Sequence, residues 1–299
     1  IGSLRERGIE KTSMRASRAV AAAALMAHAN ALRHVLVTGA NKGVGLQIAR
    51  KILTDSDASV IIGARTASNG AAALADLSSV PGSAGRVSCI DLDVCCEASV
   101  AAARKQIGLE FGSLYGLVNN AGVGFGRSVA ETLATNFYGT KRVCDAMIDL
   151  IDTPGGRIVN IASASGPMFV SRLGESAVFT QPATWDELDK TLQRYAAAPD
   201  YEGAAYGLSK AALSAYTSQL ALQRPDLKVN ACSPGFILTD LTQGMGATQR
   251  PAESKCHVAP LFLLFGEPEG NGRYYGSDAV RSPLDKYRGP GEPPYAPTE

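Results

Sequence analysis

From His34 onward, the apolar and polar positions alternate between short β-branched runs and longer helical segments. Short apolar runs bounded by turn residues are typical of buried strands, and their alternation with helical patterns predicts a parallel sheet wrapped by crossover helices. We expect strands at residues 34–38, 59–63, 87–92, 115–119, 157–161, 227–231 and 272–275. The pattern therefore predicts an α/β fold, with one doubly wound, seven-stranded parallel sheet in a single domain over residues 33–281.

Three segments lie outside this alternation. Residues 1–32 form an N-terminal extension, in which a basic stretch from Met14, an apolar stretch and small residues at 27–29 match either a cleaved targeting peptide or a surface helix. Residues 166–202 form an insertion with a helical pattern at 185–195, which acts either as a lid or as a packing element. Residues 282–299 are rich in Pro and Gly, and predict an extended tail. Two locations therefore stay open, the cytoplasm or, if segment 14–29 is a cleaved targeting peptide, an organelle.

The composition narrows the classes of partner. Apolar residues make up 45% of the 299 positions and charged residues 19%, as in globular proteins with a sizeable core. The net charge is +1 without a run of Lys and Arg, which argues against nucleic acid. The six cysteines lack a C-x-x-C pair and the three histidines lie far apart, so we expect neither a disulfide framework nor a metal site. No apolar run approaches the ~20 residues that span a bilayer, which leaves a small molecule as the expected partner.

A glycine-rich turn follows the first expected strand and opens a helix near Val44. Glycine permits unusual backbone angles and close approach, so a dinucleotide pyrophosphate could lie against the N–H groups of the helix start. A tight turn without a ligand is the alternative interpretation. The candidate residues are Gly39, Asn41, Lys42, Gly43, Val44 and Gly45.

The ends of the second and third expected strands bear on which cofactor binds. An acidic residue at the end of the second strand would favour NAD, but Arg65 is found there. Arg65 and Lys42 are both placed to bind a 2′-phosphate, which predicts NADPH, although both could be solvated surface cations. After the third strand, Asp93 and the adjacent Val94 are candidates for the adenine, and a helix N-cap is the alternative for Asp93.

Tyr206 and Lys210 stand four residues apart, a spacing that places both side chains on one face of a helix. A phenol with an ordinary pKa of about 10 exchanges protons poorly near neutrality. A nearby cation favours the phenolate and lowers that pKa. We therefore expect this pair to perform acid–base chemistry.

Together these motifs resemble the short-chain dehydrogenase/reductase family. They occur in the order of that family, as Thr38-Gly39 with Gly43 and Gly45, Asn119-Asn120-Ala121-Gly122, Ser163, Tyr206 with Lys210, and Ser233-Pro234-Gly235. The resemblance covers about residues 34–280, and segments 135–140 and 229–235 look most like the monomeric carbonyl reductase branch, which also carries an insertion before its tyrosine. It implies a Rossmann-like fold and a monomer.

The resemblance also implies a role for each matching catalytic residue. Tyr206 would donate a proton to a carbonyl oxygen, and Lys210 would lower the pKa of Tyr206 and hold the nicotinamide ribose. Ser163 would donate a hydrogen bond to the developing oxyanion, with Ser165 as the competing candidate. Asn136 would hold, through its backbone and side chain, a water that links Lys210 to solvent, or it is an ordinary buried polar residue.

By the same resemblance, two further segments would line the cofactor. Asn120, Ala121 and Gly122 would contact the adenosine ribose. Segment 234–239 would contact the nicotinamide carboxamide through Pro234, Gly235, Ile237 and Thr239. The chain departs from the family in having only 16 positions from Asn120 to Asn136, so we expect the helix before Asn136 to start late.

The expected activity is hydride transfer from NADPH to a ketone, aldehyde or quinone. A non-catalytic NADP-binding sensor or scaffold on the same fold is the alternative, because a fold does not guarantee turnover. Apolar residues that either line a substrate pocket or belong to the core are Leu173, Phe179, Trp185 and Met245.

Overall fold

The structure is a computed structural model that describes residues 33–198 and 204–295. The expected N-terminal extension with its candidate targeting peptide lies outside the described residues, as do residues 199–203 at the end of the insertion and 296–299 at the end of the tail. Within the described ranges, no helix has the length and apolar character needed to cross a membrane.

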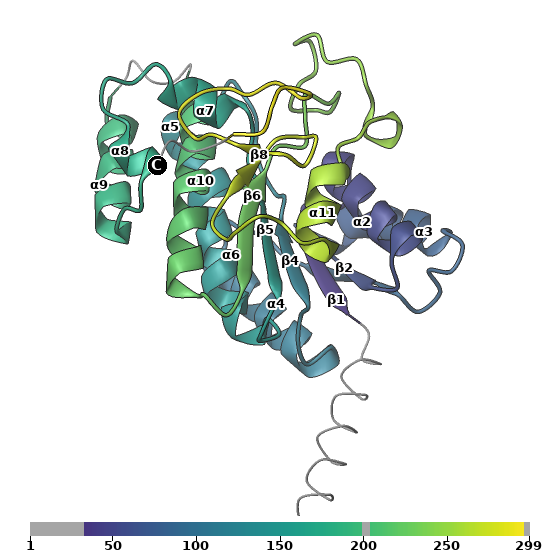
Figure 1. The fold of residues 1–299 in the computed structure, drawn as a ribbon. Coiled ribbons are helices and arrows are strands. Elements are labelled where there is room, and N and C mark those ends of the chain that lie inside the picture. The colour runs from purple at the N-terminus through teal and green to yellow at the C-terminus, as the bar shows by residue number, and fades with distance from the viewer. Residues whose placement is uncertain (1–32, 199–203, 296–299) are drawn as a thin grey trace, which may run out of the picture. The chain divides into compact units, whose positions relative to one another are not determined.

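One sheet forms the centre of the domain (Figure 1). Its strands run in the order β3-β2-β1-β4-β5-β6-β7-β8, and all neighbours pair in parallel except β7 with β8. The strands are β1 (His34–Thr38), β2 (Ser59–Ala64), β3 (Val87–Asp91), β4 (Gly116–Asn119), β5 (Arg157–Ile161), β6 (Lys228–Cys232), β7 (Tyr274–Tyr275) and β8 (Arg281–Ser282). The seven predicted parallel strands are confirmed, and the antiparallel β8 was not predicted, because two residues carry no periodic pattern.

Helices cover both faces of the sheet. They are α2 (Gly43–Asp55), α3 (Ala67–Ser78), α4 (Glu97–Glu110), α5 (Val129–Leu133), the π-helix η1 (Ala134–Gly139), α6 (Thr140–Met147), the 3-10 helix η2 (Ile148–Leu150), α7 (Ser165–Val170), α8 (Ala177–Thr180), α9 (Trp185–Ala196), α10 (Ala205–Gln223), the 3-10 helix η4 (Pro251–Glu253) and α11 (Val258–Phe265). Helices α2 and α11 lie on one face, and α4, α6 and α10 on the other (Figure 1).

The strands are apolar on both sides because each face of the sheet packs against helices. In β1, Leu36 belongs to the core cluster under α10, whereas Val35 and Val37 belong to the cluster under α2. All three side chains are fully buried. The near-continuous apolar runs of the sequence follow from this double burial.

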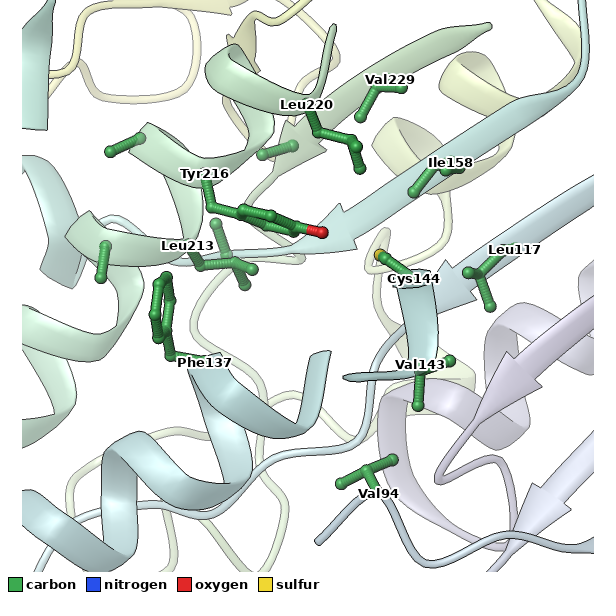
Figure 2. Close-up of a cluster of buried hydrophobic side chains, with 14 of the residues drawn as sticks. Val94, Leu117, Phe137, Val143, Cys144, Ile158, Leu213, Tyr216, Leu220 and Val229 are labelled. Carbon is green, nitrogen blue, oxygen red and sulfur yellow. The ribbon is translucent and has the colours of Figure 1, made fainter. Parts of the chain in front are cut away.

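The core beneath α10 is closed by aromatic side chains (Figure 2). Phe137 is fully buried, and its ring lies edge-on to Tyr216 at 6.1 Å between centroids. It also lies edge-on to Tyr138 at 5.1 Å, and the Trp185 ring stacks parallel to it at 5.8 Å. Because Trp185 is the first residue of α9, the contact between Trp185 and Phe137 packs the insertion against the core.

The insertion forms α7, α8 and α9, and the last two lie outside α10 (Figure 1). The predicted helix at 185–195 is confirmed as α9. It begins with a capping box, in which the Thr184 hydroxyl accepts from the Glu187 backbone while the Glu187 carboxylate accepts from the Thr184 backbone. Tyr138 donates a 2.7 Å hydrogen bond to Asp189 on the same helix.

The segment after residue 281 is more ordered than an extended tail. Arg288 is buried and donates hydrogen bonds to both carboxylate oxygens of Asp278, at 3.1 and 2.8 Å. It also donates to the carbonyl oxygens of Glu292 and Pro293 and to the Ser282 hydroxyl. The expected boundary at residue 281 therefore falls inside a connected segment that reaches at least to residue 293.

Replacing Phe137 by alanine tests the aromatic closure of the core. We expect Phe137→Ala to lower the free energy of unfolding by about 3–5 kcal/mol, because it removes a fully buried ring that three other rings contact. Urea unfolding followed by far-UV circular dichroism measures the change. The control is Leu222→Ala on exposed α10 surface, for which we expect a change within about 0.5 kcal/mol. Equal effects of the two variants would contradict this account of the core.

Candidate active site

A cleft of about 830 Å³ lies where the strands end. Its walls come from the segments that follow β1 to β6 and from the first turns of α10. The carboxyl ends of parallel strands meet at one edge of a sheet, and this edge is where open α/β folds bind ligands. The volume is in the upper part of the range for small-molecule sites.

The floor of the cleft is a junction between the turn after β1 and the loop after β4. The Thr38 hydroxyl accepts hydrogen bonds from the backbone N–H of Asn120 and of Ala121, both at 3.0 Å. The Asn120 amide donates to the carbonyls of Thr38 and Gly39 at 2.9 and 3.2 Å. A Cβ on Gly45 would lie 2.4 Å from the Asn120 amide nitrogen, so only glycine fits there.

The glycine turn leaves the start of α2 facing the cleft. Gly39 and Gly43 have φ angles of +63° and +61°, which favour glycine. Among the described residues, no side chain caps the first turn of α2. The N–H groups and the positive dipole end of this 13-residue helix are therefore available to an anion such as a phosphate.

Both expected phosphate-binding cations line the cleft, but one of them has a protein partner. Arg65 follows β2 and is exposed at the cleft. Lys42 forms a 2.5 Å ion pair with Asp240, which belongs to the loop after β6. Asp240 was not predicted from the sequence.

Asp93 and Val94 line the cleft after β3. The Asp93 carboxylate accepts a 2.9 Å hydrogen bond from the Cys95 backbone, and the Asp93 N–H donates to Ser99. The N-cap of α4 is Cys96, so Asp93 does not cap that helix. The alternative interpretation of Asp93 as an N-cap is therefore wrong, and its second carboxylate oxygen is left for a ligand.

Three candidate catalytic side chains meet in the cleft at the end of β5. Tyr206 lies at the start of α10 and lines the cleft together with Ser163, whose side chain interacts with that of Tyr206. The ammonium of Lys210, one turn further, lies 5.6 Å from the centre of the Tyr206 ring and donates to the Ile161 carbonyl at 2.7 Å. Ser165 also lines the cleft, and its backbone donates to the Ser163 hydroxyl at 3.2 Å. The interaction with Tyr206 favours Ser163 over Ser165.

The pKa shifts of Tyr206 and Lys210 differ from those expected from the sequence. Burial raises the pKa of Tyr206 above its ordinary value of 10.0, and the hydrogen bond with Ser163 opposes this effect only in part. Burial also lowers the pKa of Lys210 to about 8, although interaction with Cys232 raises it. The predicted lowering of the Tyr206 pKa by Lys210 is therefore not observed in the structure. Desolvation is the largest effect on the pKa of each group.

Asn136 lies behind the wall of the cleft, in the π-helix η1. Its amide oxygen accepts from the Val123 N–H at 2.8 Å, and its amide nitrogen donates to the Val123 carbonyl and the Ser209 hydroxyl, both at 3.0 Å. Its backbone carbonyl accepts from Thr140 at 3.1 Å. These bonds join the Asn136 side chain to Val123 on one side and to Ser209 on the other, and the expected contact with a water stays a prediction.

All predicted site residues line the cleft except Gly45 and Asn136, which support its wall from behind. The sequence analysis missed Phe125, whose ring lies 4.6 Å from that of Tyr206. It also missed further lining residues, which include Arg127, Phe236, Leu241 and Arg250. The only feature of the sequence that could have indicated these lining residues is that they lie in loops that follow recognised motifs.

The apolar residues left open as pocket or core do not line the cleft. Phe179 is fully buried next to Phe169, and Trp185 stacks on Phe137. Met245 is 44% exposed, outside the cleft lining. In the part of the insertion that the structure describes after Ser165, no residue lines the cleft.

Comparisons with known proteins agree with this arrangement. The family model described as short chain dehydrogenase matches residues 33–174. Carbonyl reductase [NADPH] 3 of Rattus norvegicus is 31% identical over 265 residues, covering 80% of this chain and 94% of that protein. Menthone neomenthol reductase from Mentha piperita superimposes with a TM-score of 0.70 at 26% identity, over 82% of this chain and 99% of that one.

Salutaridine reductase from Papaver somniferum superimposes with a TM-score of 0.71 at 25% identity, over 81% of this chain and 99% of that one. The similarity to the rat protein extends through nearly the whole length of that protein. The fold, the cleft and these similarities together show that the chain belongs to the short-chain dehydrogenase/reductase family.

Proposed function

We propose that this chain catalyses the NADPH-dependent reduction of a ketone, aldehyde or quinone carbonyl to the alcohol. The observation that carries the proposal is the meeting of Ser163, Tyr206 and Lys210 in the same cleft as the uncapped start of α2. The names of its relatives support the reaction class, since the rat relative is a carbonyl reductase [NADPH] and both structural neighbours are reductases.

The residues of the cleft fit a phosphorylated dinucleotide. The start of α2, with Gly43 at its first position, would hold the pyrophosphate, and Arg65 with Lys42 would hold a 2′-phosphate. Asp93 would accept from the adenine amino group. When bound, the reduced nicotinamide supplies a hydride to the carbonyl carbon.

The protein contributes the proton and the orientation of the carbonyl. Burial raises the pKa of Tyr206 above its ordinary value, which favours the protonated phenol, and this phenol would give the developing alkoxide the proton that it needs. Ser163 donates a hydrogen bond to the same oxygen, where negative charge develops. Lys210, with a pKa of about 8, still carries a proton near neutrality and lies next to the Tyr206 ring.

Asn136 acts in this proposal as a positioning residue. Its amide joins Val123, in the loop after β4, to Ser209, in the same helical turn as Tyr206 and Lys210. Ser209 in turn donates a 2.8 Å hydrogen bond to the Tyr206 carbonyl. The loop and the catalytic helix are thereby held together through one side chain.

Removing the phenol hydroxyl tests the proton donor. We expect Tyr206→Phe to lower turnover of NADPH with a panel of ketones, aldehydes and quinones by about 10²-fold or more, because general acid catalysis is lost. NADPH binding, measured by calorimetry, remains within a small factor of the unsubstituted protein. Turnover near that of the unsubstituted protein would overturn the assignment of Tyr206.

The two serines provide a matched pair of variants. We expect Ser163→Ala to lower turnover by about 10²–10³-fold, as the loss of one oxyanion donor does. Ser165→Ala should change it only a few-fold, because Ser165 contacts Ser163 rather than Tyr206. Steady-state rates with one substrate distinguish them, and the reverse order would assign the oxyanion contact to Ser165.

The lowered pKa of Lys210 predicts a pH-dependent contribution to stability. Between pH 8 and 10.5 the unfolded chain keeps this proton and the folded chain releases it, so stability rises with pH across this window. We expect Lys210→Met to lack this contribution. The free energy of unfolding of the unsubstituted protein should therefore rise by a few kcal/mol relative to that of the variant between pH 8 and 10.5. Urea unfolding of both proteins at a series of pH values measures the difference. A constant difference would refute the pKa assignment.

A further inference from the structure

The loop after β6 lines the cleft with a compact strap, here defined as residues 236–242. The Thr242 hydroxyl donates to the Ile237 carbonyl and accepts from the Thr239 N–H at 3.0 Å. The Thr242 N–H donates back to the Thr239 carbonyl at 3.0 Å. These bonds close residues 237–242 of the strap into one turn.

The strap contacts both walls of the cleft. On one side the Thr239 methyl group lies 3.6 Å from the position that a Cβ on Gly43 would occupy. On the other side Leu241 packs so closely on Gly124 that a Cβ there would lie 3.0 Å from the leucine Cγ. Between these contacts, Asp240 forms the ion pair with Lys42. A ligand in the cleft would therefore lie next to Thr239, Asp240 and Leu241, which all line it.

Asp240 adds a negative charge to a cleft whose ionisable lining is mainly basic. The cationic residues that line it are Lys42, Arg65, Arg127, Lys210 and Arg250, and the acidic ones are Asp93 and Asp240. The Asp240 and Lys42 side chains are 73% and 65% exposed, so each can exchange its partner for another at low cost. Asp240 thus neutralises one of the two cations that the proposed function assigns to the 2′-phosphate.

We propose that Asp240 sets the affinity for NADPH by competing with the 2′-phosphate for Lys42. This proposal rests on the proposed function. A 2′-phosphate takes Lys42 from Asp240 and leaves the carboxylate unpaired beside a second negative charge. A 2′-hydroxyl, as in NADH, leaves the Lys42–Asp240 pair in place. Asp240 therefore weakens the binding of NADPH and leaves the binding of NADH unchanged.

The experiment is calorimetric titration of the full chain with NADPH and with NADH. We expect Asp240→Asn to lower the Kd for NADPH by about two- to fivefold, the range of an exposed ion pair, and to leave the Kd for NADH unchanged. The matched control is Asp145→Asn, which removes the same charge from the exposed Lys141–Asp145 pair on α6 and should change neither Kd. An unchanged or equal response to both nucleotides would overturn the proposal.

A second comparison tests whether Lys42 carries the effect. In a Lys42→Met background, Asp240→Asn should lower the Kd for NADPH clearly less than it does in the unsubstituted chain. The reason is that no Lys42 ammonium is present for Asp240 and the 2′-phosphate to compete for. The same gain in both backgrounds would mean that Asp240 acts by repulsion alone, and would refute the competition. Raising the ionic strength to about 1 M should remove most of the gain. Failure of the unsubstituted chain to bind either nucleotide would instead refute the proposed function.

Discussion

The junction between Thr38 and Asn120 is the constraint on which the site depends. One threonine hydroxyl accepts two backbone N–H groups of the loop after β4, and one asparagine amide binds two carbonyls of the turn after β1. The junction fits only if Gly45 has no side chain. The start of α2 is thereby fixed against the neighbouring strand, and this makes its N–H groups a preorganised anion site rather than a mobile turn.

A second set of polar contacts fixes α10 to the sheet. Asn119 on β4 donates to Asn160 on β5 at 2.9 Å, and Asn160 donates to Thr217 on α10 at 2.8 Å. All three side chains are buried, so an unmade bond would cost the full desolvation of its polar groups. Together with the Asn136 amide at the other end of the helix, these bonds determine where Tyr206 and Lys210 point. The sheet and the catalytic helix therefore form one unit.

The sequence predicted the helices and strands that have a periodic pattern of apolar positions, and the site residues that belong to motifs. Strands β1 and β5 agree with their predicted bounds, whereas β8 and the buried Arg288 depend on contacts that no local pattern encodes. Phe125 and Asp240 enter the cleft only because separate loops meet there. The Tyr206 pKa was expected to fall because spacing reveals the cation but not the burial, and burial has the larger effect.

The division between sheet and loops also separates chemistry from substrate choice. Ser163, Tyr206 and Lys210 stand at a strand end and on a buried helix, where packing and hydrogen bonds leave little freedom. The side chains that face the outer cleft, including Phe125 and Phe236, are 46% and 57% exposed and belong to loops. Loops tolerate change because few buried contacts depend on them. Substitution in these loops can therefore alter which carbonyl compound fits without moving the groups that we propose to protonate and orient it.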